Sequence, residues 1–159
     1  VRHKNSQALS QVIKEHYPQV QVVAGTATAG IPHAAWVSDL LDLPMVYVRD
    51  SAKKHGKTNQ IEGHLTPGSK VVIVEDLIST GLSSLKVAQA LKEAGCQVLG
   101  VVAIFSYELK KAQEAFAEAG VSYHTLTNYD ALIEAALEAD YIAQDDVASL
   151  LEWRQTLGN

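Results

Sequence analysis

The sequence predicts an α/β fold with a mostly parallel central sheet and helices on both faces. Short β-branched runs alternate with longer segments whose apolar residues recur at helical spacing, which is typical of strand–helix–strand units. The run KVVIVE at 70–75 is apolar without alternation, as expected for a strand covered on both faces. With 159 residues and 47% hydrophobic content, the chain is predicted to form one domain, residues 1–159, with its own core.

The N-terminal half contains two helix–strand pairs. Leu9, Val12 and Ile13 recur at helical spacing within residues 1–17, and Pro18 ends that helix. The β-branched run at 20–25 is a strand, 31–41 has helical spacing, and 44–49 is a second short strand. The sequence therefore predicts that two parallel strands precede residue 50.

The C-terminal half continues the alternation. The strand at 70–75 precedes a helix at 82–94, which Gly95 ends. A strand at 97–107, a helix at 108–120 and a strand at 121–126 follow, and helices at 128–140 and 145–155 complete the chain. Five strands are predicted in all.

Residues 50–63, DSAKKHGKTNQIEG, interrupt the apolar pattern. The segment is polar, rich in lysine and glycine, and long for a connection within a compact domain. Long loops of this kind are often functional, but a surface loop with lysines for solubility explains the composition equally well. The residues alone leave both interpretations open.

Charge and composition exclude several classes of protein. A net charge of -5 and a pI near 5.6 argue against a general nucleic-acid binder, which needs a basic face. Apolar runs are shorter than a membrane span. Cys96 is the single cysteine, which rules out an internal disulfide and favours a reducing, cytoplasmic setting. Because the chain begins with Val1 directly in a helical segment, we expect that an upstream segment is missing.

Three strands deliver unusual sequence to the carboxyl edge of the predicted sheet, where ligands of such sheets bind. These segments are GTATAG at 25–30, the run that begins at Arg49, and EDLISTGLSS at 75–84. STGLSS opens a helix, so its N–H groups and hydroxyls suit a phosphate dianion, and Gly81 permits close approach of the backbone. It lacks the lysine of a Walker-type loop.

Glu75 and Asp76 would repel the phosphate itself. They suit a neighbouring group with hydroxyls to donate, or a bound Mg²⁺, as a sugar phosphate would supply. The plainer alternative is that both are solvated residues at a strand end and that Ser79 or Thr80 is an ordinary helix cap. The concentration of acids and hydroxyls in one run favours the functional interpretation.

The run VVIVEDLISTGLSS resembles the 5-phosphoribosyl 1-diphosphate (PRPP) motif of type I phosphoribosyltransferases. Arg49, Lys53, His55 and Gly56, followed by NQIEG, resemble the mobile catalytic loop of orotate phosphoribosyltransferases in their Gram-positive form. GTATAGIPHAAW and EAGCQVLGVVAIFSYEL are also similar to that family, so the resemblance covers nearly the whole chain.

The resemblance implies Mg²⁺-dependent transfer of the phosphoribosyl group from PRPP to orotate, in a homodimer whose catalytic loop, about residues 50–63, reaches the partner's site. It implies that Glu75 and Asp76 accept hydrogen bonds from the ribose hydroxyls, so that Asp76 meets the metal only indirectly, and that Ser79 also lies against orotate. The remaining PRPP-binding positions that it implies are Arg49, Lys53 and His55, with roles in catalysis; Leu77, Ile78, Thr80, Gly81, Leu82 and Ser83 around the 5′-phosphate; and Thr26, Ala27, Thr28, Ala29 and Gly30 around the pyrophosphate.

The chain departs from the family pattern in four ways. It has no clear arginine after the fourth predicted strand, around Ser106 and Tyr107, where some relatives hold the orotate carboxylate. Asp50 and Ala29 stand where some relatives carry lysine, and each change removes positive charge from a site for a polyanion. The family's N-terminal hood over the base is expected to be missing or incomplete, because the chain begins at Val1.

Three alternatives remain open at this point. One is a phosphoribosyltransferase for another nucleobase, because the PRPP motif alone does not specify the base. Another is a non-catalytic PRPP-binding regulator, although the negative net charge disfavours a nucleic-acid-binding surface. The last is a plain α/β interaction domain, since this fold carries many functions.

Overall fold

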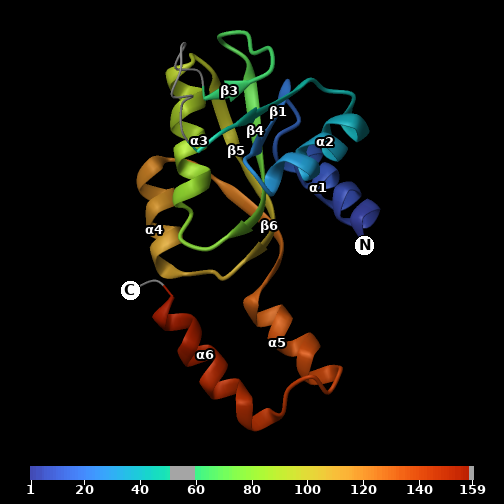
Figure 1. Ribbon diagram of the computed structural model, residues 1–159, viewed down its shortest axis with the longest axis vertical. Coiled ribbons are helices and arrows are strands. Elements are labelled where there is room, and N and C mark those ends of the chain that lie inside the picture. Colours follow the sequence, from blue (N-terminus) through green and yellow to red (C-terminus); the bar gives the residue numbers. More distant parts are fainter. Residues whose placement is uncertain (51–59, 158–159) are drawn as a thin grey trace.

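The computed structural model describes residues 1–50 and 60–157. Across this part of the chain, six strands form a single sheet in the order β3-β2-β1-β4-β5-β6 (Figure 1). The strands are β1 (Val22–Thr26), β2 (Met45–Val48), β3 (Ile61–Glu62), β4 (Lys70–Ile78), β5 (Gln97–Ser106) and β6 (Tyr123–Asn128). All neighbouring pairs are parallel except β2 with β3, which confirms the predicted mostly parallel α/β sheet.

Helices cover both faces of the sheet, as predicted (Figure 1). They are α1 (Arg2–His16), α2 (Gly30–Leu41), α3 (Leu82–Glu93), α4 (Lys110–Ala119), α5 (Tyr129–Glu138) and α6 (Val147–Thr156), with a short 3₁₀ turn at Gln144–Asp146. Helices α1 and α2 lie on one face and α3 and α4 on the other, while α5 and α6 project beyond the end of β6. Within the ranges described, a helix long and apolar enough to cross a membrane is absent.

The alternation of side chains along the strands divides the core into two layers. Ala24, Ile73 and Val101 belong to the cluster that packs against α3 and α4. Val23, Val72 and Val102 belong to the cluster that packs against α1 and α2. Because consecutive residues of a strand point to opposite faces, a continuous apolar run serves both layers at once, and this explains the pattern of KVVIVE.

Two sequence expectations need correction. Strand β4 continues to Ile78 instead of ending near residue 75, so Glu75 and Asp76 lie inside a strand and are not solvated residues at its end. The predicted loop at 50–63 contains β3 at its C-terminal end, which adds an antiparallel sixth strand. Two residues are too few to show strand periodicity, so the pattern at 61–62 could not be recognised.

Helix α1 is held against the sheet by a polar and aromatic contact at its C-terminus. The Tyr17 hydroxyl lies 2.8 Å from Ser122 Oγ, and an added Cβ at Gly100 would overlap the Tyr17 ring. The rings of His16 and His124 stack with centroids 3.8 Å apart. Burial lowers the pKa of His124 from its usual 6.5, and the charge of His16 lowers it further.

This histidine pair predicts a loss of stability in mild acid. Because the pKa of His124 is lower in the folded protein, the unfolded chain binds more protons below pH 6.5, so the free energy of unfolding falls as the pH drops through that window. Urea unfolding at pH 7.5 and at pH 5.5 measures the loss. We expect a smaller loss in His124→Gln than in the native sequence or in the exposed control His64→Gln. Equal losses in all three proteins would contradict the assignment.

Candidate active site

Three loops meet at the carboxyl edge of the sheet because β1 lies between β2 and β4. Thr26 at the end of β1 pairs in register with Val48, and Gly25 pairs with Val74. The Ala27 amide donates to the Val48 carbonyl at 3.0 Å, which ties the loop after β1 to the end of β2. Segments 26–30, 49–50 and 75–84 therefore adjoin one another, as the sequence predicts.

Gly30 brings the loop after β1 into direct contact with β4. A Cβ added at Gly30 would lie 2.6 Å from the Val74 carbonyl oxygen and 3.5 Å from the Glu75 Cα. No side chain fits in that space, so glycine is required for the approach. The contact places the N-terminus of α2 directly beside the acidic residues of β4.

The loop itself offers main-chain groups to solvent. Thr28 and Ala29 are exposed, whereas Thr26 is buried with its hydroxyl close to the Glu75 carboxyl group. The peptide bond between Ala27 and Thr28 is cis. The start of the twelve-residue helix α2 adds the positive end of its dipole to this edge.

A second such terminus follows β4. Gly81 precedes α3 with φ at 78°, and none of the described side chains caps the helix by a hydrogen bond. Ser79, Leu82 and Ser83 are exposed, with Leu82 at 53%. The Ile78 side chain, in contrast, is buried in the core, so this residue can offer a ligand only its backbone. The turn therefore presents amides and hydroxyls suited to an anion.

The two carboxylates differ sharply in environment. Glu75 is only 5% exposed, and Asp76 is half-buried. Glu75 accepts hydrogen bonds from the Asp76 amide at 3.0 Å and from Ser84 Oγ at 3.3 Å. Burial raises the pKa of Glu75 to about 8, with a further increase from the Asp76 side chain, while the nearby Thr26 hydroxyl lowers it.

Ser84 is a supporting residue that sequence reasoning left without a role. It lies on the inner face of α3, only 2% exposed, and fixes the Glu75 carboxyl group. In the sequence, Ser84 is one of several hydroxyl residues within 79–84. Only the packing of α3 against β4 shows that its hydroxyl donates to Glu75.

Arg49 lies at the base of the segment that resembles a catalytic loop. Its backbone amide donates to the Gln60 backbone carbonyl at 2.9 Å, and the Gln60 side-chain amide donates to the Arg49 backbone carbonyl at 3.2 Å. The Arg49 guanidinium pairs with Glu62 at 3.3 Å. Gln60 and Glu62 thus complete a clamp that the sequence did not reveal. The predicted residues Lys53 and His55 lie outside the described residues.

Glu75 and Asp76 are the two carboxylates that β4 brings to this edge. Throughout residues 1–50 and 60–157, no group of three or more His, Cys, Asp or Glu side chains is placed to hold a metal ion. Glu75 and Asp76 supply oxygen atoms, the type of ligand that Mg²⁺ prefers, and a partner with further oxygen atoms would have to complete the shell.

Comparison with known proteins agrees with this geometry. Residues 2–134 match the family described as the phosphoribosyl transferase domain. Orotate phosphoribosyltransferase from Listeria innocua is 61% identical over 155 residues, which cover 98% of this chain and 74% of the relative. The enzyme of that name from Fusobacterium nucleatum is 57% identical, with 99% and 74% covered.

Solved structures show the same likeness. Orotate phosphoribosyltransferase from Aeropyrum pernix superimposes with a TM-score of 0.76 at 28% identity, covering 87% of this chain and 76% of that chain. Leishmania donovani UMP synthase has a TM-score of 0.82 at 23% identity and shares the fold over 98% of this chain and 33% of its own. The chain belongs to the phosphoribosyltransferase family. Within that family, it groups with the orotate phosphoribosyltransferases.

The environment of Gly81 leads to a prediction about the stability of the turn at Ser79–Ser83. An added Cβ would meet the left-handed backbone and also the Phe116 ring at 2.6 Å. Gly81→Ala should therefore reduce the free energy of unfolding by about 2–4 kcal/mol, the sum of conformational strain and overpacking.

Gly68 is the matched control, since its φ of +89° is similar but nothing lies within 4 Å of an added Cβ. Gly68→Ala should cost about 1–2 kcal/mol from strain alone. Urea unfolding of both variants measures the difference, and equal losses would show that Phe116 does not restrict the turn.

Proposed function

We propose that PRPP and orotate react at the carboxyl edge of the sheet, between residues 26–30, Arg49 and residues 75–84. The observation that carries the proposal is the contact of Gly30 with β4, which sets two helix N-termini on either side of a carboxyl pair. A ligand with two anionic ends and hydroxyls between them matches this order, and PRPP is such a ligand.

The chain is a pentosyltransferase of pyrimidine synthesis, which transfers the 5-phosphoribosyl group from PRPP to orotate and releases pyrophosphate. Breaking the C1–O bond leaves an oxocarbenium-like ribose and a highly charged leaving group. The protein therefore contributes chiefly by positioning the reactants and stabilising the departing charge.

The turn at Ser79–Ser83 is proposed to hold the 5′-phosphate. Ser79, Leu82 and Ser83 are exposed at the uncapped start of α3, and Gly81 allows the backbone to approach the anion. Asp76, which is half-buried and precedes this turn, is proposed to accept hydrogen bonds from the ribose hydroxyls. Glu75 supports this role from below, since Ser84 and the Asp76 amide fix its carboxyl group.

The loop at Thr26–Gly30 is proposed to hold the pyrophosphate through its main-chain amides. Arg49 adjoins this loop, and its guanidinium keeps further N–H donors beyond the one that faces Glu62. Lys53 and His55 are proposed to add charge from the catalytic loop, about residues 50–63. Ala29 and Asp50 leave this set with fewer cations than in relatives that carry lysine there.

Mg²⁺ is the proposed cofactor, and the pair Glu75 and Asp76 fits it in donor type but not in number. Asp76 would act through the hydroxyls of PRPP, while the substrate's own oxygen atoms complete the shell. When bound, the ion would neutralise part of the charge on the leaving pyrophosphate.

Asp76→Asn tests the proposed site. The substitution removes the charge of the carboxylate that is proposed to accept hydrogen bonds from the ribose hydroxyls, so PRPP binding should weaken about tenfold or more. Titration calorimetry with PRPP and Mg²⁺ measures binding, and the absorbance of orotate measures PRPP-dependent turnover. The exposed Asp39→Asn is the control and should match the unchanged protein. Undiminished PRPP affinity in Asp76→Asn would reject the site, and turnover of another base in place of orotate would reject the proposed acceptor.

A homodimer in the cytoplasm, with each catalytic loop serving the partner's site, is the proposed state of the enzyme. Lys53→Ala and Asp76→Asn should each abolish most turnover alone. In mixed dimers, one site combines an intact loop with an intact carboxyl pair, so activity should reappear after the two variants are unfolded and refolded together. Orotate absorbance records the recovery. A mixture that stays inactive, although tagged subunits co-purify, would indicate that the loop acts within its own chain.

A further inference from the structure

Ser84 lies on the core-facing side of α3, although its side chain is polar. Val87 and Ala88 follow at helical spacing and belong to the core cluster on this face of the sheet. Ser84 is buried with them and only 2% exposed. A buried hydroxyl is costly without a hydrogen-bond partner, and the partner here is Glu75 Oε2 on β4, at 3.3 Å.

The Glu75 carboxyl group links Asp76 to the first turn of α3. Strand β1 pairs with β4 only as far as Val74, so the Asp76 amide lies beyond the last residue of β4 that β1 reaches. Glu75 Oε1 accepts this amide at 3.0 Å, while Oε2 accepts from Ser84. A single side chain thereby spans the distance between the main chain of Asp76 and the start of the helix.

This link is rigid because Glu75 is enclosed. Its side chain is 5% exposed, and the buried Thr26 hydroxyl lies close to its carboxyl group. A Cβ added at Gly30 would lie 3.5 Å from the Glu75 Cα, so the loop after β1 covers its backbone. In a closely packed interior, a group held in this way transmits the position of one neighbour to the other.

We infer that Ser84 is a positioning residue, which acts through Glu75 to set the separation between Asp76 and the turn at Ser79–Ser83. The inference rests on the proposed function, in which Asp76 meets the ribose hydroxyls and the turn meets the 5′-phosphate. A ligand that engages both parts is sensitive to their separation, because its own covalent geometry is fixed. A ligand that engages only the turn is not. Ser84 therefore contributes to the selection of a phosphorylated ribose over phosphate alone.

Ser84→Ala tests the inference with two ligands. Ribose 5-phosphate carries both the hydroxyls and the phosphate, whereas inorganic phosphate carries only the anion. In calorimetric titrations, ribose 5-phosphate should bind Ser84→Ala about fivefold more weakly than the native sequence, since one hydrogen bond that fixes the site is lost. The inhibition constant of inorganic phosphate, measured as a competitor of ribose 5-phosphate, should stay unchanged.

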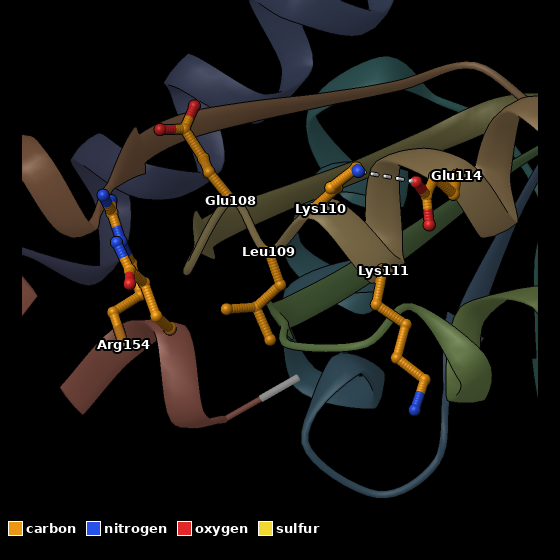
Figure 2. A pocket seen from close by; sticks show the side chains of 7 residues that line it. Glu108, Leu109, Lys110, Lys111, Glu114 and Arg154 are labelled. Atoms are coloured by element: carbon orange, nitrogen blue, oxygen red, sulfur yellow. Dashed lines mark ion pairs between the residues drawn. The ribbon is translucent and has the colours of Figure 1, made fainter. Parts of the chain in front are cut away.

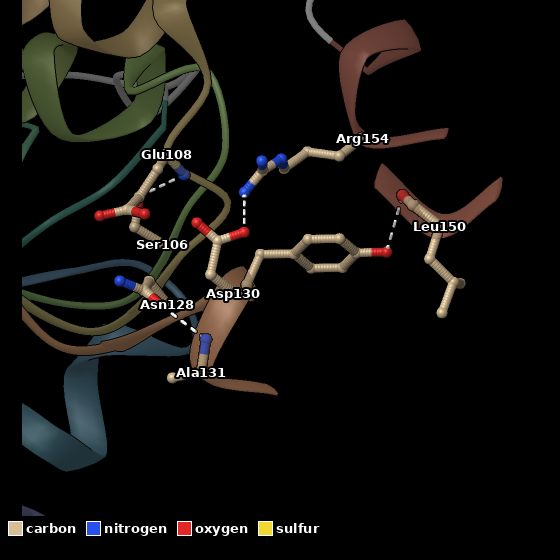
Figure 3. Close-up of polar contacts among 8 residues, drawn as sticks. Ser106, Glu108, Asn128, Asp130, Ala131, Leu150 and Arg154 are labelled. Carbon is tan, nitrogen blue, oxygen red and sulfur yellow. Dashed lines mark hydrogen bonds and ion pairs between the residues drawn. The ribbon is translucent and has the colours of Figure 1, made fainter. Parts of the chain in front are cut away.

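Competition is preferred to direct titration of phosphate because the surface carries cations elsewhere. A cavity of about 670 Å³ between the start of α4 and the last turn of α6 is lined by Lys110 and Lys111 on one side (Figure 2). Arg154 lines the other side and pairs with Asp130 at 2.7 Å (Figure 3). Displacement of ribose 5-phosphate records only the phosphate that shares its site.

Ser6→Ala is the matched control. Ser6 is also a helical serine that is 2% exposed, and its hydroxyl donates to the Arg2 carbonyl at 3.0 Å, far from β4 in the α1 helix. Both constants should stay unchanged in this variant. Comparable urea unfolding of Ser6→Ala and Ser84→Ala would show that any difference in binding does not come from a difference in folding.

Combination with Asp76→Asn separates positioning from a general structural role. If Ser84 acts by placing Asp76, then Ser84→Ala should weaken ribose 5-phosphate by less than about twofold once Asp76 has lost its charge. A residue that only stabilised the fold would cause its full loss in both backgrounds.

Three results would overturn the inference: undiminished affinity of Ser84→Ala for ribose 5-phosphate, an equal loss for both ligands, or full additivity with Asp76→Asn. Native-like binding by Ser84→Ala would leave the proposed function intact and reject only the role of Ser84. If the native sequence itself does not bind ribose 5-phosphate, the proposed site is rejected, and the inference fails with it.

Discussion

The pairing of β1 with β4 is the constraint on which the rest of the site depends. It sets Gly25 opposite Val74, and from there Gly30 can rest against the backbone of β4. That contact fixes the relative positions of three segments at this edge. They are the loop that follows β1, the carboxyl pair within β4, and the start of α3. A side chain at Gly30 would force α2 outward and separate the two helix N-termini.

Under the proposed function, the same edge would hold a polyanion beside two acids, and the burial of Glu75 reduces the negative charge that would repel it. Glu75 lies below the surface with a raised pKa, so in the ligand-free protein near pH 7 it carries less negative charge than an exposed carboxylate would. Asp76 is the member of the pair that remains open to solvent. Under the proposed function, Glu75 supports the site from inside the protein and Asp76 faces the ligand. The two environments differ because consecutive side chains of a strand point to opposite faces of the sheet.

The sequence predicted the sheet and its helices well because apolar runs and helical spacing are local signals. The carboxyl-edge loops were predictable for the same reason, since they interrupt those runs. What could not be predicted depends on distant contacts. Ser84 acquires its role only when α3 packs on β4, and Gln60 and Glu62 only when β3 turns back along β2. Strand β4 exceeded its predicted end because backbone pairing with β5 continues through polar residues. Arg154 meets Asp130 and Tyr129 only through the tertiary packing of α6 against α5.

Strand β3 has a further consequence for the sheet as a whole. An edge strand exposes unpaired amides and carbonyls that another polypeptide can adopt as a template. Here one edge is a strand of only two residues that runs against the direction of its neighbours, ending at the left-handed Gly63. An extended segment of another polypeptide would therefore find few unpaired backbone groups with which to form hydrogen bonds on that side. The short antiparallel strand β3 thereby also protects this edge of the sheet against edge-to-edge aggregation.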